Sequence, residues 1–237
     1  MKSPPPLVIA HRGFSARFPE NTLAAVRAAL ALRVDYVEID VQQTRDGQLI
    51  VFHDYRLNRL CGVPGRVRDH TLTELRRWKP DVPTLAQVLR ACRDRAGVLI
   101  EIKGADPRAV AALIARLGME KQVIVFSINA RRMEQFAAAA PRIPRFALIA
   151  RNLKSQISNL KLSVSGLGLG RHLVTARAVV NRVHRRGWRL FVWTVNRPAE
   201  MRRLIAWGVD GLITNHPDRA LDEVRGQRSE IRRLKSA

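Results

Sequence analysis

The sequence has little cysteine, few aromatic residues and no long apolar run, and each shortage excludes a class of protein. Two cysteines in 237 residues, Cys61 and Cys92, argue against a disulfide framework, and we expect both to be free thiols. Aromatic residues are only 5% of the chain, so no stacking platform for nucleic acid is evident. No apolar run approaches the roughly 18 residues of a membrane span, so we expect no membrane insertion.

Acidic residues are also scarce, at 20 against 42 lysines and arginines, which gives a net charge of +22. The basic residues are dispersed, so we expect them on helix surfaces and expect no specific nucleic-acid partner, although weak binding to polyanions at low salt follows from charge alone. Hydrophobic residues make up 46% of the chain, ample for a buried core. The chain enters a predicted strand within its first ten residues, which leaves no room for a signal peptide and predicts a cytoplasmic protein.

Short apolar runs that predict strands alternate with amphipathic stretches that predict helices. The expected strands are Leu7–Ala10, Tyr36–Val41, Val98–Ile102, Val123–Phe126, Phe146–Ala150, Leu162–Leu167, Leu190–Val195 and Gly211–Thr214. The expected helices are Asn21–Arg33, Leu85–Asp94, Pro107–Leu117, Ala130–Ala140, Leu153–Leu160, Thr175–Arg186, Pro198–Trp207 and Pro217–Lys235. Eight strand–helix units with continuous apolar strands predict one domain over residues 1–237, a TIM-type (β/α)8 barrel of the α/β class, with a basic tail from about 225.

One further strand-like segment, Gln48–His53, breaks this alternation. Only a short turn separates it from the second strand, and a parallel strand needs a crossover of about a dozen residues. We therefore expect a β-hairpin excursion with Asp46-Gly47 as a two-residue turn. That register would place Asp40 opposite His53, with Glu38 on the same face.

Four short clusters at or near strand ends carry most of the residues suited to chemistry. Carboxylates are the ligands that a hard divalent cation prefers, basic side chains bind phosphate, and histidines transfer protons. Two carboxylates at i and i+2 in an apolar parallel strand would be costly without a cation or another partner. Such a set suits metal-assisted hydrolysis of a phosphodiester. The clusters are His11-Arg12-Gly13, Glu38-Ile39-Asp40, His53-Asp54 and Glu101-Ile102-Lys103.

From Ile9 to about Pro217 the chain resembles the glycerophosphodiester phosphodiesterases, of the phospholipase-C-like phosphodiesterase barrel group. The resemblance implies a barrel with its active site at the C-terminal mouth and hydrolysis of glycerophosphodiesters to an alcohol and sn-glycerol 3-phosphate. It rests on nine motifs in family order and at family-like spacing: Ala10-His11-Arg12-Gly13, Pro19-Glu20-Asn21-Thr22, Glu38-Ile39-Asp40-Val41, Thr44-Arg45-Asp46-Gly47, Phe52-His53-Asp54, Pro83-Thr84-Leu85, Glu101-Ile102-Lys103, Trp193-Thr194-Val195-Asn196 and Gly208-Val209-Asp210-Gly211.

The resemblance also implies individual roles. Glu38, Asp40 and Glu101 would be the metal ligands, and His11 and His53 the acid/base pair. A ligand set of three carboxylates with the histidines left free favours one divalent cation, Mg²⁺ or Ca²⁺, over zinc. We expect His11 to act as the base and His53 as the acid.

Three more residues are expected to contact a small-molecule glycerophosphodiester substrate. Arg12 and Lys103 would bind its phosphate, and Trp193 would form an apolar wall for its glycerol. Each has a structural alternative: Arg12 as a surface arginine, Lys103 in an ion pair with Glu101, and Trp193 as a packed residue at the top of a barrel strand.

Two departures from the family pattern concern the substrate pocket. Thr214-Asn215 stands where members usually carry Thr-Asp, and the run Ser165–Gly170 is nearly bare of polar side chains. Two other functions stay open: a phospholipase-D-like or lysophospholipid phosphodiesterase on the same barrel, and a non-catalytic basic barrel that binds anions. Attack by the glycerol 2-hydroxyl, through a cyclic phosphate, and direct attack by water also remain open.

Overall fold

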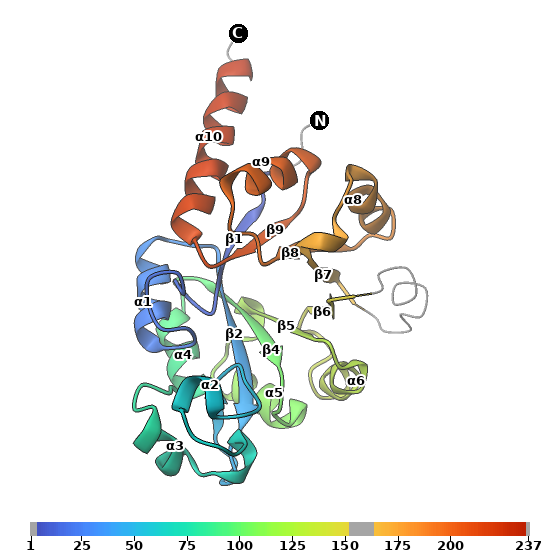
Figure 1. Ribbon diagram of the computed structural model, residues 1–237. Coiled ribbons are helices and arrows are strands. Elements are labelled where there is room, and N and C mark those ends of the chain that lie inside the picture. Colours follow the sequence, from blue (N-terminus) through green and yellow to red (C-terminus); the bar gives the residue numbers. More distant parts are fainter. Residues whose placement is uncertain (1–3, 152–163, 236–237) are drawn as a thin grey trace.

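In the computed structural model, which describes residues 4–151 and 164–235, eight parallel strands close into a barrel inside a ring of helices (Figure 1). The strand order is β1-β9-β8-β7-β6-β5-β4-β2, and β1 pairs with β2 to complete the circle. The TIM-type barrel predicted from the sequence is therefore confirmed. The barrel strands are β1 (Leu7–His11), β2 (Tyr36–Gln43), β4 (Gly97–Ile102), β5 (Val123–Ser127), β6 (Arg145–Ile149), β7 (Gly166–Gly170), β8 (Arg189–Trp193) and β9 (Gly211–Thr214).

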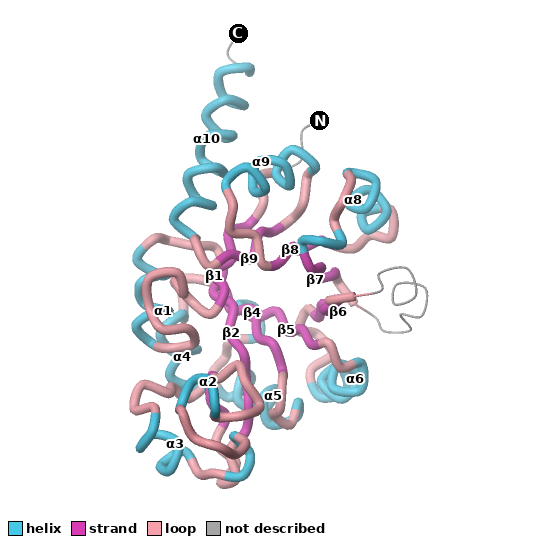
Figure 2. Tube along the Cα trace, in the orientation of Figure 1, coloured by secondary structure: helices cyan, strands magenta, loops and turns pink. Residues whose placement is uncertain are grey.

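The helices cover the outside of the strands, as the tube in Figure 2 shows. Side-chain caps fix several helix starts: Thr22 accepts from the Ala25 N–H, and Thr84 forms a capping box with Gln87. No helix among the described residues is long and apolar enough to span a membrane. The helices are α1 (Leu23–Ala31), α2 (Asn58–Cys61), α3 (Leu72–Trp78), α4 (Leu85–Cys92), α5 (Pro107–Arg116), α6 (Ala130–Ala139), α8 (Arg177–His184), α9 (Pro198–Trp207) and α10 (Pro217–Lys235). The helix expected at Leu153–Leu160 lies outside the described residues.

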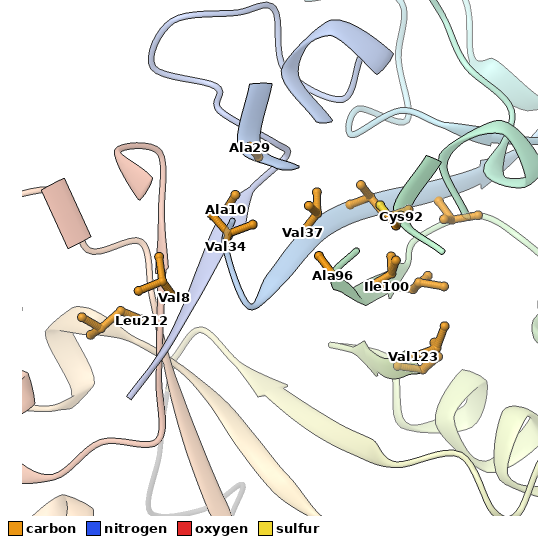
Figure 3. Packing of buried hydrophobic residues seen from close by; sticks show 14 of the residues in the cluster. Val8, Ala10, Ala29, Val34, Val37, Cys92, Ala96, Ile100, Val123 and Leu212 are labelled. Carbon is orange, nitrogen blue, oxygen red and sulfur yellow. The ribbon is translucent and has the colours of Figure 1, made fainter. Parts of the chain in front are cut away.

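Strand alternation divides the apolar residues of the barrel into two cores, and a third, smaller cluster lies in the excursion after β2. Side chains that point outward from the strands pack against the helices, where Figure 3 shows Val8, Ala10 and Val37 on the side of Ala29 and Cys92. Side chains that point inward fill the barrel, and they form a separate cluster of Ile9, Leu99, Ile124, Phe126, Phe146, Leu148, Phe191 and Ile213. Because side chains alternate with period two, His11 and Glu101 follow the inward residues two positions further along their strands. Cys92 is buried in the outer core, and both cysteines are free thiols, as expected.

Strand β7 runs from Gly166 to Gly170, whereas the predicted strand was Leu162–Leu167. Its first two predicted residues lie outside the described residues, and Val164 and Ser165 are not in a strand. Its sequence Gly-Leu-Gly-Leu-Gly alternates, and Leu167 and Leu169 are fully buried in the outer core. The glycines leave space for large side chains inside the barrel: a Cβ on Gly166 would lie 2.6 Å from the Phe146 ring. The predicted end at Leu167 was wrong because glycine is usually depleted in strands, whereas here the barrel interior has no room for a larger side chain at these positions.

Strand β3 (Leu49–Val51) folds back antiparallel on β2, so the predicted hairpin is present, but its register differs by one residue. Val41 pairs with Val51, and the Phe52 N–H donates to the Asp40 carbonyl. Asp40 therefore lies opposite Phe52, and the predicted pairing with His53 is wrong.

The turn chemistry explains the shift in register. Thr44 Oγ1 contacts Asp46 Oδ1 at 2.6 Å, and the Thr44 N–H donates to the Gln48 carbonyl. Gly47 takes a left-handed conformation at φ 77°. The loop therefore holds three residues, with Gly47 last, in place of the two-residue Asp46-Gly47 turn. His53 consequently follows the end of β3 instead of lying within it.

Candidate active site

Strand register brings the predicted site residues to one end of the barrel. His11 is the register partner of Glu38 between β1 and β2, and Asp40 is the partner of Glu101 between β2 and β4. The three carboxylates thus come from two adjacent strands and converge near the C-terminal ends, as expected for a TIM-type barrel.

Glu38, Asp40 and Glu101 form a compact acidic cluster. Each offers an oxygen, these atoms lie within 4.8 Å of one another, and all three residues are buried. Burial and the neighbouring Asp40 raise the pKa of Glu38 well above its usual range, and the same causes raise that of Glu101 to about 7. An all-oxygen set of mutually repelling carboxylates fits a hard divalent cation, so the cluster can bind a metal ion.

Arg12 and Lys103 surround this cluster with positive charge. Arg12 Nε lies 3.1 Å from Asp40 Oδ2, and Lys103 Nζ lies 2.8 Å from Glu101 Oε1 and 3.4 Å from Asp40 Oδ1. Burial alone would raise the pKa of Asp40, but these two cations hold it below its usual value. Lys103 therefore does form the ion pair with Glu101, and its ammonium still lines the cavity described below.

A strained turn after β1 sets the position of Arg12. Arg12 has φ 56° and Gly13 has φ 79°, both in the left-handed region. This conformation points the Arg12 N–H at Glu38 Oε2, 3.0 Å away. Gly13 packs so tightly that a Cβ would lie 2.5 Å from the carbonyl carbon of Ala25, so only glycine fits. The His-Arg-Gly motif is thus a turn that brings both a guanidinium and a backbone donor to the acidic cluster.

His11 is held from β9, the strand that pairs with β1 on the side away from β2. Its Nδ1 lies 2.6 Å from Asn215 Oδ1, and its Nε2 lies 3.9 Å from Glu38 Oε2. Burial, with the Arg12 guanidinium next in importance, lowers the pKa of His11 to about 4. Asn215 is the residue that departs from the family's Thr-Asp, and the structure gives it a direct contact with His11.

His53 belongs to a second chain of contacts. Its Nδ1 lies 2.5 Å from Asp54 Oδ1, and Arg59 binds both oxygens of Asp54, from Nε at 2.7 Å and Nη2 at 2.9 Å. Arg59 also donates to Glu20, whose Oε1 accepts from Arg12 as well. The hydrogen bonds from Arg59, with that of His53 next in importance, lower the pKa of Asp54 to about 2.

A cavity of about 190 Å³ opens at this mouth. One wall carries His11, Arg12, Glu38, His53, Glu101 and Lys103, and the other carries Phe126, Ile128, Leu148, Trp193 and Ile213. All the predicted site residues except Asp40 therefore line one cavity, and Asp40 lies among Arg12, Lys103 and Asn21. The asymmetry of the two walls matches a ligand with an anionic part and an apolar or neutral part.

Three residues outside the predicted ligands and acid/base pair support this site: Asn21, in a motif that the sequence left open between helix capping and a supporting role near the metal, and Gln42 and Arg59, which the sequence did not identify. Asn21 donates from Nδ2 to Asp40 Oδ2 at 2.9 Å, and Gln42 donates from Nε2 to the backbone carbonyls of His53 and Asp54. Gln42 is an inward residue two positions after Asp40, so strand alternation could have flagged it. Arg59 carried no such signal. It lies on a short helix of the excursion and is one of many arginines in the chain.

Comparison with known proteins places this arrangement in a family. The sequence profile described as the Glycerophosphoryl diester phosphodiesterase family matches residues 11–219. The chain belongs to this family. A glycerophosphodiester phosphodiesterase from Caldanaerobacter subterraneus is 32% identical, with 92% of this chain and 98% of the relative covered.

Solved structures agree in fold. A glycerophosphodiester phosphodiesterase from Agrobacterium tumefaciens has a TM-score of 0.79 at 28% identity, covering 91% of this chain and 98% of its own. A phosphodiesterase from Oleispira antarctica, solved in complex with the product sn-glycerol-3-phosphate, has a TM-score of 0.82 at 25% identity, covering 93% and 97%.

Proposed function

We propose that this protein hydrolyses glycerophosphodiesters to an alcohol and sn-glycerol 3-phosphate, using a divalent cation and two histidines. The observation that carries the proposal is the single cavity in which His11 and His53 face a buried carboxylate cluster and two basic side chains. Anion binding alone would not require three buried carboxylates beside the phosphate-binding groups, so the arrangement favours catalysis over a non-catalytic basic barrel.

Glu38, Asp40 and Glu101 would hold one cation, Mg²⁺ or Ca²⁺, because both prefer oxygen ligands. When bound, the cation supplies positive charge next to a non-bridging phosphate oxygen. Arg12 and Lys103 face the same cavity, and their cations balance the charge that shifts onto the phosphate oxygens in the transition state.

His11 is assigned as the general base and His53 as the general acid. Asn215 occupies Nδ1 of His11, which leaves Nε2 to take the proton of the nucleophile, either the glycerol 2-hydroxyl or water. Asp54 occupies Nδ1 of His53, which leaves Nε2–H to protonate the leaving alkoxide as the P–O bond breaks. If the 2-hydroxyl attacks, water then opens the cyclic phosphate with the two roles reversed.

Trp193 is assigned to the glycerol side of the substrate. It lies on the apolar wall, and its buried Nε1–H has no hydrogen-bond partner among the described residues. An unpaired buried donor is rare, so an oxygen of the bound substrate is a fitting acceptor for it.

The test is release of glycerol 3-phosphate from glycerophosphocholine, measured with EDTA and with added Mg²⁺, Ca²⁺ or Mn²⁺. We expect turnover that EDTA abolishes and one of the cations restores. Turnover of lysophosphatidylcholine in its place would indicate the lysophospholipid phosphodiesterase. Turnover unchanged by EDTA would contradict the metal-dependent mechanism.

A further inference from the structure

Arg59 belongs to the chain of contacts around His53, the proposed general acid, and the proposed function leaves its role unexplained. It lies on α2, in the excursion between β3 and α4, and half of its side chain is exposed. Surface arginines usually gain little from one carboxylate, but Arg59 binds two of them with its planar fork. Its Nε and Nη2 reach Asp54 at 2.7 and 2.9 Å, and Nη2 also reaches Glu20 at 2.6 Å.

These two carboxylates lead to opposite halves of the site. Asp54 contacts Nδ1 of His53, the proposed general acid, at 2.5 Å. Glu20 accepts from Arg12 Nη1 at 3.0 Å, and Arg12 pairs with Asp40 at the acidic cluster. Charges therefore alternate in sign from Asp40 through Arg12, Glu20 and Arg59 to Asp54.

We propose that Arg59 is a positioning residue for the reaction: it fixes the Asp54 carboxylate so that the His53 ring presents Nε2 to the leaving group. This inference rests on the proposed function. Asp54 is itself only about one-fifth exposed, and its carboxylate could turn toward solvent if the two guanidinium bonds were absent. His53 would then lose the partner that orients its ring, whereas the substrate-binding wall would remain in place.

The variants are Arg59→Ala and Arg59→Lys, with Arg56→Ala as the matched control, because Arg56 is an exposed arginine three residues earlier. We expect Arg59→Ala to lower kcat on glycerophosphocholine about 10- to 100-fold, a part of the full general-acid contribution, with KM changed less than about threefold. On an analogue with p-nitrophenol as leaving group the loss should be under about threefold, because that group needs no proton. The kcat of Arg59→Lys on glycerophosphocholine should lie between those of the unaltered protein and Arg59→Ala, since one ammonium cannot replace the planar fork of the guanidinium. Added guanidinium should restore turnover to Arg59→Ala alone.

A second measurement does not depend on turnover. The Nδ1–H proton of His53 should give a downfield NMR signal protected from exchange in the full-length protein and in Arg56→Ala, and the signal should disappear in Arg59→Ala. Its assignment comes from a His53→Asn sample. If the unaltered protein does not turn over glycerophosphocholine, the proposed function fails and this signal still judges Arg59. A persistent signal, or equal kinetic losses on both leaving groups, would overturn the assignment of Arg59.

Discussion

Replacing Glu38 with Gln should separate the stability of the fold from the requirements of the site. Glu38 is 1% exposed, and an oxygen of each of the other two carboxylates lies within 4.8 Å of it. Two unit charges at that distance repel by about 3 kcal/mol at an effective dielectric constant of 20. Attraction to Arg12, whose N–H also donates to Glu38, offsets part of this. A glutamine retains an acceptor for that N–H and removes the charge.

We therefore expect Glu38→Gln to be more stable than the unaltered protein in EDTA, by about 1–2 kcal/mol, or roughly 3–6 °C in Tm for a chain of this size. With cation the order should reverse. A ligand at 100 times its Kd stabilises the folded state by about 2.7 kcal/mol, and the variant, lacking one ligand, should gain little. Turnover of glycerophosphocholine should be lost.

The assay is thermal or urea denaturation of both proteins in EDTA and in a concentration series of Mg²⁺ and of Ca²⁺, followed by circular dichroism. The crossing of the two stability orders is the signature. A variant that is less stable in EDTA would show that the carboxylate is not under repulsion. A variant that keeps the full cation-induced shift would show that Glu38 is not a ligand.

Three further outcomes follow from the same contacts. His11→Ala and His53→Ala should each lower kcat about 10²- to 10⁴-fold, and the double variant should lose less than the product of the two losses. Only the loss in His53→Ala should be smaller on a substrate with p-nitrophenol as leaving group. Equal losses on both substrates would contradict the two roles. Because the pKa of His11 is lowered to about 4 in the folded protein, the unfolded chain binds its proton first. This residue's contribution to stability should therefore fall as pH drops from about 6.5 to 4, by about 3 kcal/mol in total, measured as the difference from His11→Gln by urea denaturation in EDTA. Gly168→Ala should destabilise the barrel by about 1–3 kcal/mol in the same assay, because its Cβ would lie 2.9 Å from Leu148 Cδ1. An unchanged free energy of unfolding would show that the interior can adjust.

The barrel and the convergence of its carboxylates could be predicted because both depend on local periodicity. Inward and outward side chains alternate along each strand, so Glu38 and Asp40 had to share a face, and Glu101 repeats the pattern on the next barrel strand. A parallel sheet with register fixed by burial then brings these strand ends together, whatever the loops do.

The register of the hairpin could not be predicted in the same way. A two-residue and a three-residue turn both accommodate Asp46-Gly47, and the choice depends on hydrogen bonds made by Thr44. A shift of one residue moves His53 off the strand, and Gln42 then holds its carbonyl. His53 still lines the cavity, because a side chain at the end of a strand can reach the mouth from either register.

The contacts that orient the two histidines could not be predicted from the sequence because they join residues that are far apart in the chain. Asn215 meets His11 across 204 positions of sequence, and Arg59 meets Glu20 across 39. Neither contact has a periodic signature, because each is made by a loop or a short helix that closure of the barrel brings to the mouth. The residue types that perform chemistry are constrained by the reaction, so they stand out in a sequence. The residues that orient them need only a suitable hydrogen-bonding group at the right place. Arg59 is one arginine among many, and Asn215 stood out only as a departure from the family's Thr-Asp, with nothing in the sequence to connect it to His11. Histidine orientation in this barrel is therefore a property of the assembled mouth, and substitutions at Asn215 and Arg59 should affect it without altering the strands that carry the carboxylates.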